Sequence, residues 1–137
     1  MKTIQQFMFL VALACVGCAG TGSGSSSGGS SGTPAVTVQM TGGHAFNPIN
    51  VTVPAGSIVQ WKNVDTARHT VASDTNVAGM NSDPAFGSGL PGGATFNWTI
   101  PSGATSGTVF FYHCEIHGAA GNGTSFGSGM VGSVTVQ

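Results

Sequence analysis

From about residue 35 onwards, apolar and polar residues alternate with a period of two over several short stretches. This period puts alternate side chains on opposite faces of an extended chain, so each stretch predicts a half-buried β-strand. The stretches are residues 36–39, 49–53, 58–61, 95–100, 108–114 and 130–136. Gly and Pro lie between them, as in the turn at residues 54–57. Short strands separated by such turns predict an all-β sandwich or barrel.

The same alternation assigns faces in the last two predicted strands. Phe110, Tyr112 and Cys114 share one face of the strand at 108–114. His113 falls on the other face, and we expect it to point outward. In the last strand, Met130 shares its face with the apolar residues that follow it, so it is expected to point into the core.

The N-terminus has the pattern of an export signal, which we assign to residues 1–18. Lys2 precedes an apolar run over 4–16, and that run is too short to span a membrane comfortably. Cys15 and Cys18 each follow a small residue, which resembles a bacterial lipoprotein signal whose Cys becomes lipidated. We therefore expect membrane attachment through Cys15 or Cys18, while ordinary signal cleavage remains open.

Residues 19–33 consist almost entirely of Gly, Ser and Thr. Such a segment cannot bury a core and is typical of a flexible tether. Residues 34–137 remain for one small folded domain.

Charge is scarce, because only 5% of the residues are Asp, Glu, Lys or Arg. Outside the leader, Lys62 and Arg68 are outnumbered by four acidic residues, leaving a net charge of about −2. That charge argues against nucleic-acid binding and against strong electrostatic steering. We expect a monomer that docks transiently through an apolar surface.

One group of side chains suggests chemistry. Cys114 and His117 stand three residues apart where an apolar strand ends, with Met130 downstream and His69 well upstream. A thiolate, two imidazoles and a thioether suit copper, because soft sulfur favours Cu(I) and imidazole accepts both oxidation states. His44, in a glycine-rich turn, is expected to be exposed.

Two other interpretations of this group remain open. Structural zinc requires four ligands, commonly with a second Cys or His pair, and residues 34–137 contain a single Cys. A Cys–His pair can also form a nucleophile. The number and softness of the donors favour copper.

Several segments resemble cupredoxins of the plastocyanin and pseudoazurin group. They are residues 46–56, 59–71, 86–96, 112–117 and 129–136. The resemblance implies a Greek-key β-sandwich of about eight strands holding one type 1 copper. It also implies His69, Cys114 and His117 as equatorial ligands and Met130 as the axial ligand.

The chain departs from this family in one place. Twelve residues, 118–129, separate His117 from Met130, whereas plastocyanin-like members have a much shorter ligand loop. The surface around His117 is therefore expected to differ. Met40 and Met80 are the other methionines of the domain, and their sequence contexts suit an axial ligand less well.

The resemblance implies a one-electron carrier, and not an enzyme, that works between periplasmic or membrane-associated redox partners. Electrons would leave at His117, where partners dock. A copper storage or delivery module is the alternative, and a detached domain of a multicopper oxidase or nitrite reductase is a weaker third.

Overall fold

Eight strands and one short helix make up residues 32–137, the part of the chain that the computed structural model describes. The elements are β1 (Val36–Thr41), β2 (Ala45–Asn47), β3 (Asn50–Val53), β4 (Ile58–Asn63), β5 (Ala72–Ser73), α1 (Asp83–Phe86), β6 (Thr95–Thr99), β7 (Val109–Ala119) and β8 (Ser128–Val136). The predicted leader, with Cys15 and Cys18, and nearly all of the predicted linker lie outside the described residues.

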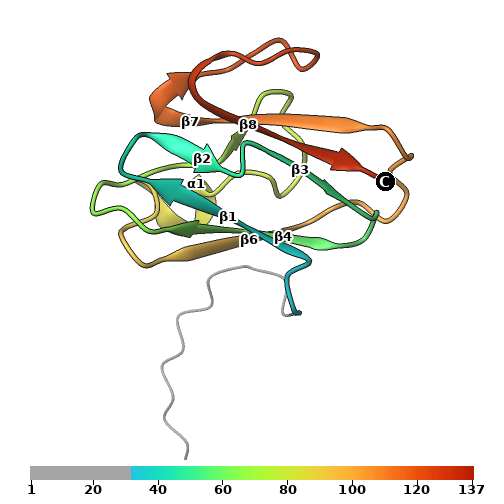
Figure 1. The fold of residues 1–137 in the computed structure, drawn as a ribbon, viewed down its shortest axis with the longest axis horizontal. Helices are drawn as coiled ribbons and strands as arrows, with labels where there is room; N and C mark the ends of the chain where they lie inside the picture. Colours follow the sequence, from blue (N-terminus) through green and yellow to red (C-terminus); the bar gives the residue numbers. More distant parts are fainter. Residues whose placement is uncertain (1–31) are drawn as a thin grey trace, which may run out of the picture.

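The strands form two four-stranded sheets that pack face to face (Figure 1). One sheet has the order β2-β1-β4-β6 and the other β3-β8-β7-β5. Each contains one parallel pair, β1 with β4 and β3 with β8, and the other neighbours are antiparallel. The predicted all-β sandwich of about eight strands is confirmed.

Aromatic side chains dominate the core between the sheets. The ring of Tyr112 meets Phe46 edge to face at 4.8 Å and Trp61 at 5.1 Å, and all three side chains are buried. Such pairs stabilise a core beyond the burial of their area. Met130 is also buried, as the alternation predicts for the last strand.

The β7–β8 hairpin extends further than the sequence pattern predicts. Pairing resumes beyond an irregularity, with Gly118 opposite Gly129 and Ala119 opposite Ser128. His117 therefore lies within β7 and not on a loop after it. The two strands approach closely here, since a Cβ on Gly118 would lie 2.8 Å from the carbonyl oxygen of Ser128.

His113 is largely buried, which contradicts the expectation that it points outward. It does lie on the face away from Cys114, but the segment between β7 and β8 lies near this face. His113 Nδ1 is 2.7 Å from an oxygen of Asp74, whose other oxygen accepts a 2.8 Å hydrogen bond from the backbone of Gly121. The alternation indicated the face correctly, but it could not show what lies over it.

Helix α1 is a single turn over four residues, with Pro in its first turn. Its length explains why no helical period is visible in the sequence. Among residues 32–137, no helix has the length and apolar character needed to cross a membrane.

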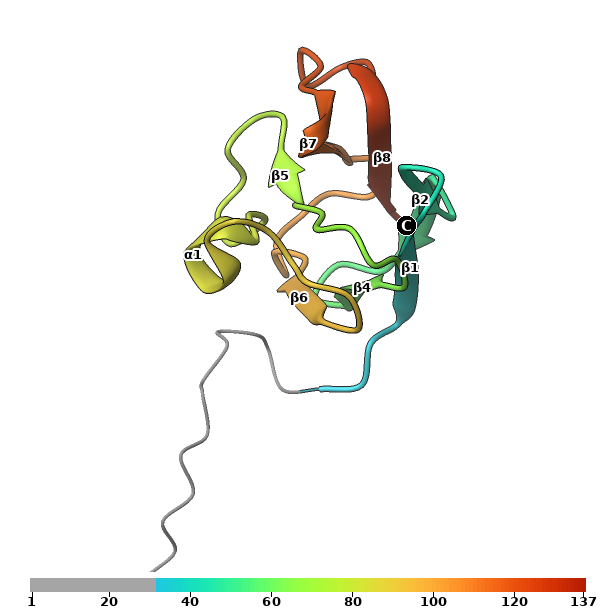
Figure 2. The ribbon, with the colours of Figure 1, turned by 90° about the vertical axis from the view of Figure 1, so that its left-hand side faces the viewer.

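One end of the sandwich brings together segments far apart in sequence. The turn between β1 and β2, the chain after β4 and the end of β7 all lie toward the left of Figure 1. Figure 2 views the molecule from that end, with β5 and α1 beside the strand ends. His69, Cys114 and His117 come together at this end of the sandwich.

Candidate metal centre

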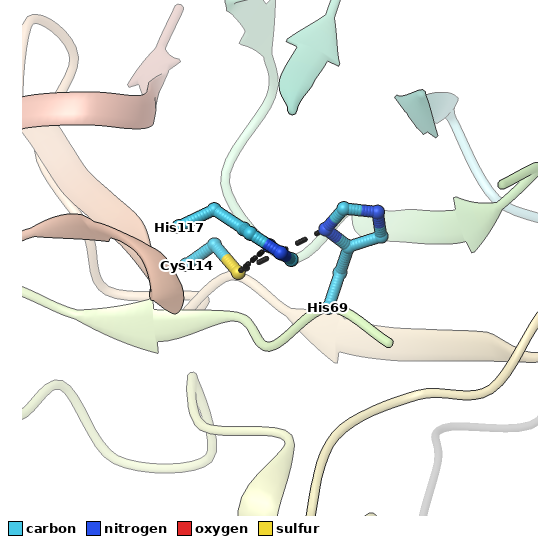
Figure 3. Close-up of side chains that lie close together, drawn as sticks. All are labelled: His69, Cys114 and His117. Atoms are coloured by element: carbon cyan, nitrogen blue, oxygen red, sulfur yellow. Dashed lines mark hydrogen bonds between the residues drawn. The ribbon is translucent and has the colours of Figure 1, made fainter. Parts of the chain in front are cut away.

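His69, Cys114 and His117 form one cluster (Figure 3). Their potential ligand atoms all lie within 4.8 Å of one another. Cys114 Sγ is 3.5 Å from His117 Nδ1 and 3.9 Å from His69 Nδ1. Each imidazole thus directs Nδ1 toward the sulfur. His69 and Cys114 are fully buried, and His117 is partly exposed.

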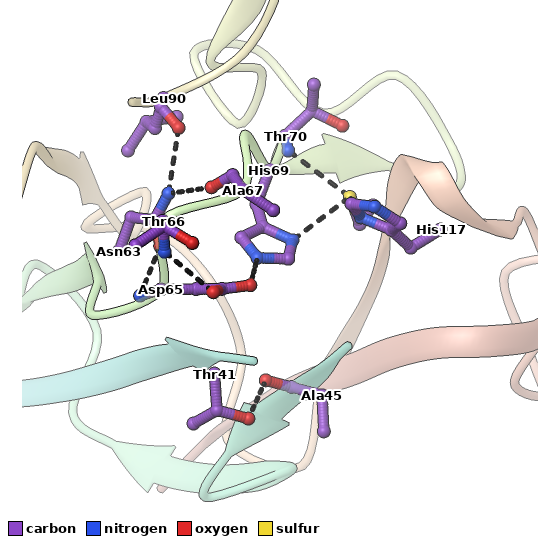
Figure 4. Close-up of polar contacts among 11 residues, drawn as sticks. Thr41, Ala45, Asn63, Asp65, Thr66, Ala67, His69, Thr70, Leu90 and His117 are labelled. Carbon is purple, nitrogen blue, oxygen red and sulfur yellow. Dashed lines mark hydrogen bonds and ion pairs between the residues drawn. The ribbon is translucent and has the colours of Figure 1, made fainter. Parts of the chain in front are cut away.

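The backbone around His69 is held on both sides. His69 and Leu90 form an antiparallel bridge, with N–H···O distances of 3.3 Å and 2.7 Å. The buried amide of Asn63 donates to the carbonyls of Ala67 and Leu90 at 2.7 Å and 2.9 Å (Figure 4). The segment that carries His69 is therefore tied to the end of β4 and to the neighbouring chain.

Asp65 orients the ring of His69. Its Oδ2 lies 3.0 Å from His69 Nε2, and this bond is the main reason that the pKa of the Asp65 carboxyl is lowered. A carboxylate on one ring nitrogen sets the tautomer and leaves the other nitrogen free to bind a metal. The free nitrogen here is Nδ1, which faces Cys114.

Thr70 supports Cys114 and the residue after it. Its backbone N–H donates to Cys114 Sγ at 3.3 Å, and its hydroxyl accepts a 2.7 Å bond from the backbone N–H of Glu115. A hydrogen bond to sulfur favours the thiolate and is one of the contacts that tune a metal–thiolate site. The hydrogen bond thus fixes the position of the sulfur and offsets part of the cost of burying it.

His117 has a different environment. Its ring stacks on that of His44, with centroids 4.0 Å apart and planes 14° from parallel. Burial lowers the pKa of His117, and the nearby His44 and His69 lower it further. A lowered pKa favours neutral imidazole, which is the form that binds a metal.

Met130 lies beside the cluster in the strand register. His113 pairs with Val131 and Gly118 with Gly129, so the four residues 114–117 of β7 bulge opposite Met130 alone. Its side chain is 1% exposed. This position agrees with the axial role that the resemblance implies, and ligation by Met130 stays a prediction.

The set of donor atoms favours copper over structural zinc and over a Cys–His nucleophile. Among the described residues, no fourth His, Cys, Asp or Glu joins the three in the cluster, whereas structural zinc takes four such ligands. Complete burial of Cys114 leaves its thiol poorly placed to attack a substrate. One thiolate and two imidazoles fit a type 1 copper ion.

Two residues of this site escaped the sequence analysis. Asp65 lies in a segment that resembles cupredoxins and was assigned no role of its own, although its spacing of four residues from His69 is a possible signal. His44 was expected to be exposed, and it is, but its contact with His117 was not foreseen. The two histidines stand 73 positions apart, so no local pattern links them.

Comparison with solved structures places this fold among known proteins. A purple cupredoxin from Nitrosopumilus maritimus is 25% identical, covers 74% of this chain and 99% of its own, and has a TM-score of 0.51. An oxidised amicyanin variant is 20% identical, covers 75% and 82%, and has a TM-score of 0.52. A copper-containing nitrite reductase from Thermus scotoductus is 23% identical, with a TM-score of 0.52, over 77% of this chain and 22% of its own. No family model matches the chain.

The described domain therefore has the cupredoxin fold, and its His-Cys-His cluster fits a type 1 copper site. This combination is that of a blue copper protein and supports an electron carrier in general. The resemblance seen in the sequence is confirmed for the fold. His69, Cys114 and His117 lie together as it implies, and their roles as ligands stay a prediction.

Proposed function

We propose that this protein is a one-electron carrier in which His69, Cys114 and His117 hold a single copper ion. The observation that carries the proposal is the position of the buried Cys114 sulfur beside the Nδ1 atoms of both histidines. Bound copper would supply the Cu(I)/Cu(II) couple. The residues of the chain hold the donors in place.

Rigidity is the property of these residues that suits electron transfer. Asp65 fixes the ring of His69, and Thr70 fixes the sulfur of Cys114. Asp65, His69 and Thr70 lie between β4 and β5, in a segment that the His69–Leu90 bridge and the amide of Asn63 hold in place. Donors that cannot rearrange keep the structural change between oxidation states small, and this favours fast transfer over substrate chemistry.

His117 is the proposed point of contact for redox partners. It is the only partly exposed member of the described cluster, and the neighbouring Ile116 side chain is 50% exposed. The domain carries few charges for its size. These features support brief docking through an apolar surface, with the protein acting as a monomer and binding no nucleic acid.

The storage or delivery alternative predicts a different behaviour. A delivery site must release its metal, and exchangeable ligands serve that purpose better than a buried thiolate. Reversible reduction of the loaded protein, without loss of copper to a chelator, supports the carrier. Loss of copper on reduction would favour delivery. The match to the nitrite reductase covers 22% of that chain, so its enzymatic activity is not carried over to this domain.

Export and anchoring form a separate proposal. The pattern of residues 1–18, with Cys15 and Cys18, supports export to the cell envelope or periplasm and lipid attachment. The Gly/Ser-rich residues 19–33 would tether the domain, 34–137, to the membrane. Mass spectrometry of the mature N-terminus tests this, because an unmodified first residue contradicts lipidation.

The central experiment compares wild-type protein with Cys114→Ser after copper loading. Wild type is expected to show an intense visible band from thiolate-to-copper charge transfer, together with the electron-spin-resonance spectrum of type 1 copper. The serine variant should lack the band and keep the β-sandwich, as circular dichroism would report. A variant that retains the band contradicts the assignment of Cys114.

A further inference from the structure

We propose that His44 is a positioning residue that holds the ring of His117 in its orientation toward Cys114 by stacking on it. His44 does not belong to the cluster of potential ligands. Its role toward copper rests on the proposed function, but its role toward His117 belongs to the protein without metal. Three observations support this assignment.

The first observation is the geometry of the three imidazoles. His44 lies almost parallel to His117, with centroids 4.0 Å apart and planes 14° from parallel. Its contact with His69 is looser and edge-on, at 6.1 Å and 64°. The stack therefore acts on His117 in particular, and offset stacking of aromatic rings is attractive beyond the burial of area.

The second observation is that the two candidate histidine ligands are held differently. His69 is fixed by the Asp65 carboxylate on Nε2. Within residues 32–137, the ring of His117 has one polar contact, the 3.5 Å approach of its Nδ1 to Cys114 Sγ. Contact with neighbouring rings is then the main restraint on the outer part of His117. The ring of His69 lies 4.7 Å away and is tilted by 54°, whereas the ring of His44 is nearer and stacks on it at 4.0 Å.

The third observation is the backbone of the β1–β2 turn. His44 has a φ of 51°, in the left-handed region that non-glycine residues adopt at a cost. Two glycines, Gly42 and Gly43, come just before it, yet the left-handed position is given to a histidine. Backbone conformations of this kind persist where the surroundings enforce them, often at functional sites. The turn itself does not require an imidazole, whereas the stack on His117 requires a ring.

The turn holds His44 from both sides. Its N–H donates to the carbonyl of Thr41 at 3.0 Å, and the Thr41 hydroxyl donates to the carbonyl of Ala45 at 3.2 Å. Neither bond involves the side chain of His44, which is left free to stack. Substitutions at position 44 can therefore change the ring while the turn is retained.

Three variants separate the ring from the backbone. His44→Phe keeps a ring but no ring nitrogen. His44→Asn removes the ring and tolerates the left-handed conformation. His44→Gly removes the ring and the backbone cost together, so relief of the left-handed conformation offsets part of the stability lost with the stack. Circular dichroism then confirms that the sandwich is retained in each variant.

The first measurement uses metal-free protein and nuclear magnetic relaxation of the His117 ring. Wild type and His44→Phe are expected to show an ordered ring, whereas His44→Asn and His44→Gly show a mobile one. The second uses copper-loaded protein. Loss of the stack should speed copper release to a chelator roughly two- to tenfold, the size expected for one aromatic pair, and should alter the spin-resonance spectrum.

The outcomes are distinct. Wild-type ring order in both His44→Asn and His44→Gly overturns the proposal, and so does a Phe variant that behaves like the Asn variant, because stacking would then not be the cause. Ring mobility that depends on residue 44 supports the proposal even in a protein that shows no copper band. Failure of that band in wild type would overturn the proposed function alone.

Discussion

The carboxylate of Asp65 and the imidazole of His69 share a hydrogen bond of 3.0 Å on the side of the ring that faces away from Cys114. Asp65 thus places a negative charge directly against the ring of His69, which is a proposed copper ligand. A negative charge there stabilises Cu(II) more than Cu(I), because the oxidised ion carries the larger positive charge. The same bond keeps Nδ1 directed at the sulfur.

Asp65→Asn is expected to raise the reduction potential. The amide oxygen can still accept from Nε2, so the geometry is retained while the charge is lost. We expect a shift on the order of 50 mV, close to one tenfold change in the ratio of the two copper affinities. Cyclic voltammetry measures it. Asp74→Asn removes the same charge from a residue that contacts no proposed ligand, and serves as the control.

Met130→Leu tests the axial ligand. If Met130 is a weak axial donor, copper stays bound to His69, Cys114 and His117, and the potential rises on the order of 50 mV because loss of a donor favours Cu(I). The visible spectrum should change with it. Met80→Leu alters another buried methionine and should leave both unchanged. A Met130→Leu protein with the wild-type potential would show that Met130 does not ligate.

Asp74→Ala should loosen the segment between β7 and β8 with little effect on the copper spectrum. The Asp74 side chain is 1% exposed, and it joins His113 to the backbone of Gly121. Removing it leaves both partners unpaired, at a cost of about 3 kcal/mol in the free energy of unfolding. Urea denaturation measures that cost, and amide hydrogen exchange at residues 118–129 should become faster.

Should hydrogen exchange across 118–129 stay at the wild-type rate, Asp74 does not anchor this segment. Thr105→Ala is a suitable control, since Thr105 is exposed and lies between β6 and β7, outside this segment. It should leave both the unfolding free energy and the exchange rates near their wild-type values.

Glu115→Gln should stabilise the metal-free domain at neutral pH. The pKa of Glu115 is raised above its ordinary value of 4.5. The largest cause is a hydrogen bond with the neighbouring Asp83 carboxyl, followed by burial and by repulsion from the charge of Asp83. A raised carboxyl pKa means that the folded state binds more protons than the unfolded state. The contribution of Glu115 to the free energy of unfolding is therefore fully present below about pH 4. It is lost as the pH rises through the pKa that Glu115 has in the folded state.

Thermal melts at several pH values check this sign. The glutamine variant should melt higher than wild type at pH 7, and the two should converge at pH 3, where Glu115 is protonated in wild type. An advantage that persists unchanged at pH 3 would point to packing and not to charge as the cause.

Much of the fold could be predicted from the alternation of side chains. Burial on one face of a sheet imposes a period of two, so six of the eight described strands and the inward faces of Tyr112, Cys114 and Met130 were visible in the sequence. The two short strands β2 and β5 were not visible, and neither was the extent of β7. Its pairing beyond His117 depends on the close approach of Gly118 and Gly129, and glycines carry no hydrophobic signal.

The candidate donors His69, Cys114 and His117 could be named from the sequence, through their residue types and the resemblance to cupredoxins, because a thiolate and imidazoles suit copper wherever they lie in the chain. Only the tertiary structure decided what surrounds those donors. The stack of His44 on His117, and the bonds that join His113 through Asp74 to Gly121, arise from contacts between β7 and segments outside it. Loop conformations follow from long-range packing, which the local period of apolar residues does not encode.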